Sequence, residues 1–184
     1  PLKIEKFSKK NSIDRKKFII LLPGRLSLWK GQKIFIEALK LLSEQNNNQP
    51  FEGIILGDDQ GRSVYKKQLI ALVEQYRLKK NIKIIDHCDD MPVAYKIANL
   101  VCSCSSEPEA FGRISVEAQS MGIPIIASDI GGSTETIVKD KTGFLFKSGD
   151  SQALANAIIM VMQKDYNSLK SIGLEGRKNI LKKF

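Results

Sequence analysis

The sequence contains no apolar run that approaches the ~20 residues required for a membrane-spanning helix. Its first 17 residues are polar and basic, and they lack the apolar core of a secretory signal peptide. Cysteine and histidine are scarce, with three Cys and one His among 184 residues. These absences argue against a chain built to cross a membrane and against a site assembled from histidines.

The three cysteines, Cys88, Cys102 and Cys104, are an odd number and lie in or beside strand-like runs. Cys102 and Cys104 alternate along one run, so both are expected on the same face of a strand. A zinc site would need a fourth ligand, and His87 is the only histidine. We therefore predict buried free thiols in a reducing cytoplasm, and no metal site.

The composition suits a soluble globular domain, because 42% of the 184 residues are hydrophobic. The first residue is not Met, so we expect a domain taken from a longer protein. The net charge is +9, but the basic residues are spread along the whole chain without interleaved aromatic residues. Phosphate-bearing substrates or an anionic membrane surface would explain this charge as well as nucleic acid would, and nucleic acid is not expected as a partner. A solvated basic face is the simplest interpretation.

Strand-like and helix-like runs alternate from residue 18 to the end of the chain. This alternation predicts an α/β fold with a doubly wound, Rossmann-like parallel sheet over residues 18–184, preceded by a linker or extension over 1–17. The predicted strands are 18–22, 51–56, 82–85, 100–104, 124–128 and 143–146. The predicted helices are 32–45, 63–76, 91–98, 113–121, 131–138, 151–162 and 168–183, and 46–50 is a turn cluster.

The most informative segment extends from Ser106 to Glu117 and has the sequence SEPEAFGRISVE. Glu109 falls in a loop after a predicted strand, and Glu117 falls inside the helix that begins after Gly112. The first amides of a helix have no intrahelical partner and attract anions. Two carboxylates around such an anion site suit hydroxyl groups on either side of a phosphate, which suggests a nucleotide sugar.

This segment resembles the Glu-x7-Glu motif of retaining glycosyltransferases with the two-Rossmann-domain (GT-B) architecture, family four. The resemblance implies that Glu109 contacts the transferred hexose and that Glu117 contacts the nucleotide ribose. It further implies that the amides of Phe111 and Gly112 hold the sugar and the β-phosphate, with Arg113 near the nucleoside. Read without the resemblance, the two glutamates are ordinary loop and helix carboxylates.

A second signal is Gly24-Arg25, followed five residues later by Lys30 and a glycine. Two cations on a loop that leads into a helix suit a diphosphate, on which charge builds as the sugar bond breaks. The same family has this pattern, so the resemblance places Gly24, Arg25 and Lys30 around the donor diphosphate. The alternative is a basic surface loop. Trp29, between the two cations, has two positions open to it, packing against the domain or bordering the cleft, and we expect packing.

The loop after the third predicted strand, 86–90, corresponds to the loop that contacts the nucleotide base in that family. The resemblance implies that His87, Cys88 and Asp89 line the base pocket, and we expect no proton transfer from His87. The segments 57–62, 90–92, 107–113 and 117–119 together resemble a bacterial branch that builds lipopolysaccharide core or related surface glycans. Gly131-Gly132 resembles a family turn that lets the backbone come close to the helix that carries the glutamate pair.

The resemblance covers one half of a GT-B enzyme, the C-terminal donor-binding half, and the N-terminal acceptor half is absent. It implies a retaining hexosyltransferase that takes a UDP-, GDP- or ADP-linked sugar without a metal or other cofactor. The acceptor would be a glycan or a lipid-linked molecule, and this chain alone would be inactive. We expect a cytoplasmic protein, with peripheral contact at the inner face of the cytoplasmic membrane.

Two other functions remain open at this point. A GT-B-type nucleotide-sugar epimerase would need acid–base residues that the sequence does not display. A non-catalytic module that only binds a nucleotide sugar would need nothing more than the residues named above.

Overall fold

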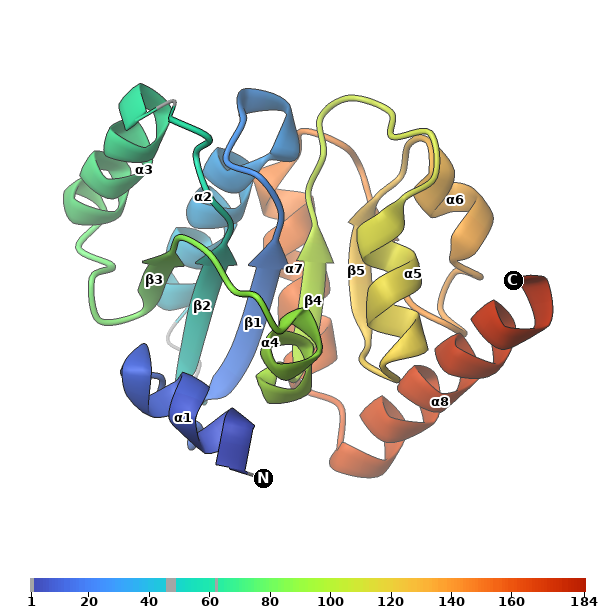
Figure 1. Ribbon diagram of the computed structural model, residues 1–184. Coiled ribbons are helices and arrows are strands. Elements are labelled where there is room, and N and C mark those ends of the chain that lie inside the picture. Colours follow the sequence, from blue (N-terminus) through green and yellow to red (C-terminus); the bar gives the residue numbers. More distant parts are fainter. Residues whose placement is uncertain (1, 46–48, 62) are drawn as a thin grey trace.

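Six apolar segments pair into one parallel sheet in the order β3-β2-β1-β4-β5-β6 (Figure 1). The computed structural model describes residues 2–45, 49–61 and 63–184, so Arg62 and most of the predicted turn at 46–50 lie outside it. The strands are β1 (Phe18–Pro23), β2 (Phe51–Leu56), β3 (Ile82–Ile85), β4 (Leu100–Ser103), β5 (Ile125–Ser128) and β6 (Phe144–Phe146). The doubly wound α/β fold expected from the sequence is confirmed. Because the chain order reverses between β1 and β4, ligands are expected above that junction.

Helices cover both faces of the sheet (Figure 1). One face carries α2 (Gln32–Glu44), α3 (Ser63–Gln75) and α7 (Ser151–Met162). The other carries α1 (Leu2–Lys10), α4 (Met91–Ile97) and α5 (Arg113–Ser120), with α6 (Gly132–Thr136) beside α5. The last helix, α8 (Tyr166–Lys183), packs along α5, and a short 3₁₀ helix, η1 (Leu28–Lys30), precedes α2.

The strands β1, β2, β4 and β5 are buried along their whole length, as a parallel sheet between two helical layers requires, whereas the edge strand β3 is only partly buried. In β1, Ile20 and Leu22 join the core beneath α2 and α7, while Ile19 and Leu21 join the core beneath α4 and α5. Continuous apolar runs therefore predict these strands well. The observed boundaries lie within two residues of the predicted ones, and α8, for example, begins at Tyr166 instead of 168.

The helix α1 is an element that the sequence analysis did not identify within the predicted extension. It packs against α4 through Ile4 and Phe7, and Lys3 forms an ion pair of 2.8 Å with Asp90. Only two large apolar side chains face inward among many charged ones, so the segment resembles a linker in its composition. None of the helices in residues 2–45, 49–61 and 63–184 is long and apolar enough to cross a membrane.

Candidate functional site

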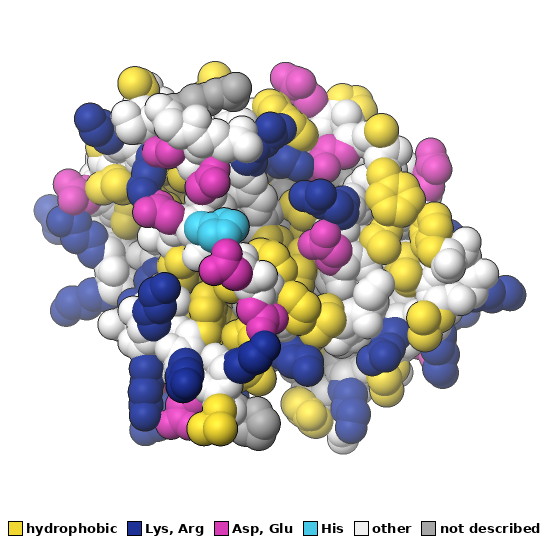
Figure 2. Space-filling view, in the orientation of Figure 1, with side chains coloured by type: hydrophobic (Ala, Val, Ile, Leu, Met, Phe, Trp, Pro, Cys, Tyr) yellow, Lys and Arg dark blue, Asp and Glu magenta, His cyan; other side chains and the backbone are white. Residues whose placement is uncertain are grey.

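A pocket of about 750 Å³ opens at the carboxyl ends of β1 and β4, where the strand order reverses. Its volume is in the range of small-molecule sites. Figure 2 shows this hollow next to the single histidine, with apolar side chains in its floor and acidic and basic side chains around it. The sequence-predicted residues that line it are Gly24, Arg25, Lys30, His87, Cys88, Glu109, Phe111, Gly112, Arg113 and Glu117.

The loop that carries the two cations is fixed by backbone contacts. The amide of Leu26 donates to the carbonyl of Asp58 at 2.9 Å, and the buried Gln32 side chain donates to the carbonyl of Arg25 at the same distance. Gly31, with φ of 71°, lies so close to β4 that a Cβ would fall 1.8 Å from the carbonyl oxygen of Cys104. These contacts place Lys30 inside the pocket, while Arg25 stays exposed near its edge and donates to Gln60 Oε1 at 3.3 Å.

Lys30 and Glu109 form an ion pair inside the pocket, with Nζ 2.8 Å from Oε1. Their side chains are only 12% and 17% exposed, and the Ser105 hydroxyl donates to the same carboxylate oxygen. The Lys30 ammonium also lies 4.3 Å from the centre of the Trp29 ring, in cation–π contact. Trp29 thus borders the cavity, contrary to the packing role expected from the sequence, because η1 turns its ring toward the ammonium.

The loop before α5 is held by the paired glycines at 131 and 132. The amide of Gly132 donates to the Glu109 carbonyl at 2.7 Å. A Cβ on Gly131, whose φ is 58°, would lie 2.6 Å from the Glu109 backbone nitrogen, so only glycine fits here. These glycines do make a close approach, but to the loop before α5 and not to the helix itself as expected from the sequence. This approach fixes the residues that lead into Gly112, the residue before the first turn of α5.

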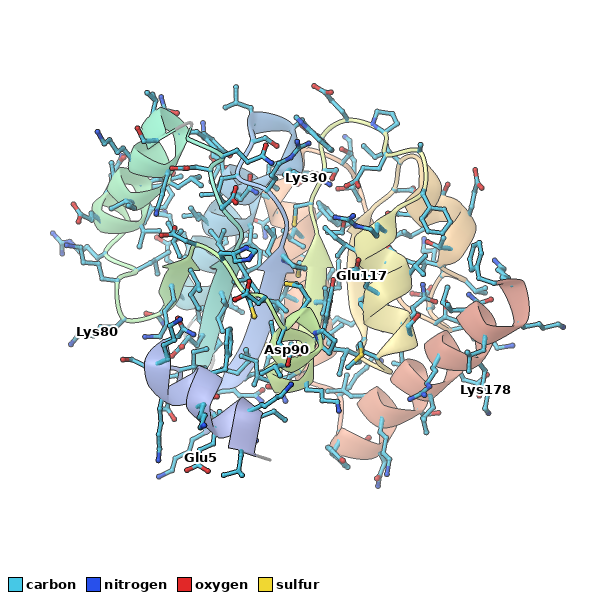
Figure 3. The ribbon with its side chains drawn as sticks, viewed as in Figure 1. Glu5, Lys30, Lys80, Asp90, Glu117 and Lys178 are labelled. Carbon is cyan, nitrogen blue, oxygen red and sulfur yellow. The ribbon has the colours of Figure 1, made fainter. Side chains whose placement is uncertain are left out.

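The second glutamate, Glu117, points from α5 into the same pocket (Figure 3). Its Oε2 accepts a 2.6 Å hydrogen bond from the Tyr95 hydroxyl on α4, and its Oε1 lies 3.3 Å from Nε of Arg113. Burial, and then the hydrogen bond to Glu117, raise the pKa of Tyr95, so the phenol remains a donor. The sequence analysis missed Tyr95, because nothing local to α4 indicates a partner 22 residues away.

His87, Cys88 and Met91 also line the pocket. Cys102 and Cys104 are buried free thiols, as predicted. Cys88 was expected to be buried too, but it is only half-buried. This partial burial raises the pKa of the Cys88 thiol. Asp89 does not line the pocket: its side chain is 98% exposed and lies 2.9 Å from Nε2 of His87.

Phe111 contributes to the pocket wall, but its side chain is half-exposed and stacks edge-on against Phe184, with ring centroids 5.2 Å apart.

Asp58 and Asp59 accept hydrogen bonds from backbone amides of their own turn, those of Gln60 and Gly61. Within the described ranges, no three His, Cys, Asp or Glu side chains are grouped as metal ligands would be. The groups that the pocket offers to a ligand are the cations of Arg25 and Lys30, the separate carboxylates of Glu109 and Glu117, and the amides at the N-terminus of α5.

The family model described as "Glycosyl transferases group 1" matches residues 3–179. The capsular polysaccharide biosynthesis glycosyltransferase CapM of Staphylococcus aureus is 27% identical over 168 residues, which cover 91% of this chain and 42% of CapM.

Solved structures of other proteins share the whole fold, and two examples follow. A glycosyltransferase from Rickettsia africae superposes with a TM-score of 0.94 and 31% identity, covering 100% of this chain and 48% of that one. Anabaena HepE, solved in complex with UDP and glucose, superposes with a TM-score of 0.88 and 31% identity over 100% of this chain and 48% of that one. The chain thus spans less than half the length of these similar proteins.

Proposed function

Because the chain belongs to the group 1 glycosyl transferases, we propose that it is the donor-binding half of a retaining hexosyltransferase. The observation that carries the proposal is the placement of Lys30–Glu109 and Glu117 in one pocket, with the N-terminus of α5 between the two glutamates. If a ligand's phosphate bound at the N-terminus of α5, Glu109 would face the group attached on one side of the phosphate, and Glu117 would face the group on the other side. A nucleotide diphospho-hexose has this layout, with a sugar on one side of the diphosphate and a ribose on the other.

The proposed donor site assigns one task to each group. Arg25 and Lys30 bind the diphosphate, and the amides of Phe111, Gly112 and the first turn of α5 bind its β-phosphate. Glu109 orients the hexose hydroxyls, Glu117 binds the ribose, and the segment with His87 and Cys88 borders the base. HepE binds UDP, and we propose a uridine nucleotide here, ahead of GDP or ADP, with no metal required.

The proposed reaction retains the configuration of the anomeric carbon. The bond from this carbon to the β-phosphate oxygen breaks while the acceptor oxygen bonds to the same face. The leaving phosphate takes the proton of the acceptor hydroxyl. Arg25 and Lys30 stabilise the charge that develops on that phosphate. Isolation of a sugar covalently bound to Glu109 would disprove this front-face mechanism.

We place the acceptor site of the proposed enzyme in a further domain, since this chain spans 42% of CapM and 48% of the Rickettsia protein. We propose a glycan or lipid-linked acceptor of the bacterial surface, of the lipopolysaccharide or capsular type. CapM, named for capsular polysaccharide biosynthesis, supports this class. The net charge of +9 suits a cytoplasmic enzyme in peripheral contact with an anionic membrane that carries such an acceptor.

The test is calorimetric titration of the chain with UDP, GDP, ADP and their hexose conjugates, first with EDTA and then with Mg²⁺. Binding of one nucleotide in EDTA, weakened at least tenfold by Arg25→Ala and by Glu117→Ala, supports the proposal. Arg177→Ala is the matched control, because Arg177 is an exposed arginine of α8 outside the pocket. Absence of nucleotide binding, or equal effects of all three variants, would overturn it. Conversion of a free nucleotide sugar to its epimer without acceptor would point to an epimerase.

A further inference from the structure

Two helices from different parts of the chain meet at Glu117. Tyr95 lies on α4 and is 2% exposed, so its ring is locked in the core with Ala94 and Ala118. Its hydroxyl is the one polar atom of that side chain, and it donates to Glu117 Oε2 at 2.6 Å. A buried tyrosine hydroxyl normally has a partner. Here the partner is a carboxylate on the wall of the pocket.

The other bond to Glu117 holds it less firmly. Arg113 is four residues earlier on the same helix, its side chain is 82% exposed, and the contact distance is 3.3 Å. Exposed ion pairs of this spacing contribute little to stability. The arginine can therefore change rotamer in solvent, whereas the tyrosine has no room to do so. The rotamer of Glu117 is set from α4.

We propose that Tyr95 is a positioning residue that orients Glu117 toward the ribose hydroxyls and so makes the site selective for ribonucleotides over deoxyribonucleotides. This rests on the donor-binding function proposed above. Each carboxylate oxygen has two lone pairs. Glu117 therefore keeps acceptor capacity on both oxygens after it has bonded Tyr95 and Arg113. Two hydroxyls of one ribose can occupy that capacity only if the carboxylate plane is held still.

The location of Tyr95 strengthens the assignment. It is on the helix that directly follows the base segment with His87 and Cys88, and Met91 of the same helix also lines the pocket. The base and the ribose of one nucleoside are thus bordered by a single short stretch, α4 and the loop before it. Burial raises the pKa of Tyr95, which keeps the hydroxyl protonated as pH rises.

The experiment compares the affinities for UDP and 2′-deoxy-UDP. Tyr95→Phe keeps the buried ring and removes only the hydroxyl, and Tyr76→Phe is the control, since Tyr76 packs on the opposite face of the sheet. The unmodified chain is expected to prefer UDP by about tenfold, because a hydrogen bond to a charged group contributes ~1.5 kcal/mol or more. Tyr95→Phe is expected to lose most of this preference while its affinity for 2′-deoxy-UDP changes less than about twofold.

Two further results decide the matter. In a Glu117→Gln background the added Tyr95→Phe change is expected to have no further effect, because the two residues act as one unit. If Tyr95→Phe keeps the full preference for UDP, or weakens both nucleotides equally, Tyr95 is only a core residue and the inference is wrong. If the unmodified chain binds neither nucleotide, the donor-binding proposal itself fails, and this inference fails with it.

Discussion

Nζ of Lys30 lies 2.8 Å from Oε1 of Glu109, so the cation proposed for the diphosphate and the carboxylate proposed for the hexose are in direct contact. Both side chains are largely buried, and the pair joins η1 to the loop before α5. Removal of either partner would leave a charge without compensation in a confined site, which is costly. A change at Lys30 is therefore expected to disturb Glu109 as well, and a change at Glu109 to disturb Lys30, even without a bound ligand.

A first prediction concerns Lys30→Met, which keeps an unbranched side chain nearly as long as that of lysine and removes its charge. We expect transfer by the intact enzyme to fall about 100-fold or more, because a group that stabilises developing charge is lost. Lys33→Met is the control, since Lys33 is exposed on α2 and forms an i,i+4 ion pair with Glu37 on the same helix. Steady-state kinetics with a nucleotide-sugar donor measures both. Equal activities of the two variants would contradict the role of Lys30.

A second prediction concerns Gly131→Ala. The new Cβ would lie 2.6 Å from the backbone nitrogen and oxygen of Glu109, so the Glu109 loop must move and nucleotide-sugar binding should be lost. Gly149→Ala is the control: its φ is also positive, at 79°, but nothing lies within 4 Å of the added carbon. Both variants should lower the melting temperature, because alanine is strained at positive φ. Only Gly131→Ala should lose binding in a calorimetric titration.

A third prediction uses the thiols as reporters of the pocket. Cys88 lines it, whereas Cys102 and Cys104 are buried in the core, so a maleimide should label only Cys88 in the folded chain. Burial raises the pKa of Cys88, so less thiolate is present at a given pH, and the labelling rate should rise at a higher pH than for a free cysteine. Mass spectrometry of the labelled chain gives site and rate. Bound UDP should slow the labelling of Cys88. If saturating UDP leaves the labelling rate unchanged, the nucleotide base does not bind beside Cys88.

A fourth prediction separates Asp89 from its neighbours. Its side chain is 98% exposed and does not line the pocket. We expect Asp89→Ala to change nucleotide affinity by less than about twofold, since surface substitutions away from a site have small effects. Met91→Ala, on the pocket wall, should weaken binding measurably. A large loss of nucleotide affinity in Asp89→Ala, with none in Met91→Ala, would show that Asp89 contacts the base as the sequence predicted.

The sequence by itself determined the six strands, the helices from α2 to α8 and the edge of the sheet at which the pocket lies, but not α1. Apolar runs such as 18–22 and 51–56 specify strands that are buried on both faces, and the alternation of strands with amphipathic runs specifies a parallel sheet. A parallel sheet places the loops after its strands at one edge. The loops with Arg25, His87 and Glu109 were therefore predictable neighbours.

Only the tertiary structure decided which side chains touch. The bond from Tyr95 to Glu117, the contact of Lys30 with both Trp29 and Glu109, the outward turn of Asp89 and the packing of α1 on α4 all depend on how separate elements sit against one another. Periodicity and turn chemistry act between residues near in sequence. A contact between distant residues depends on the helix packing and side-chain directions that the assembled sheet imposes.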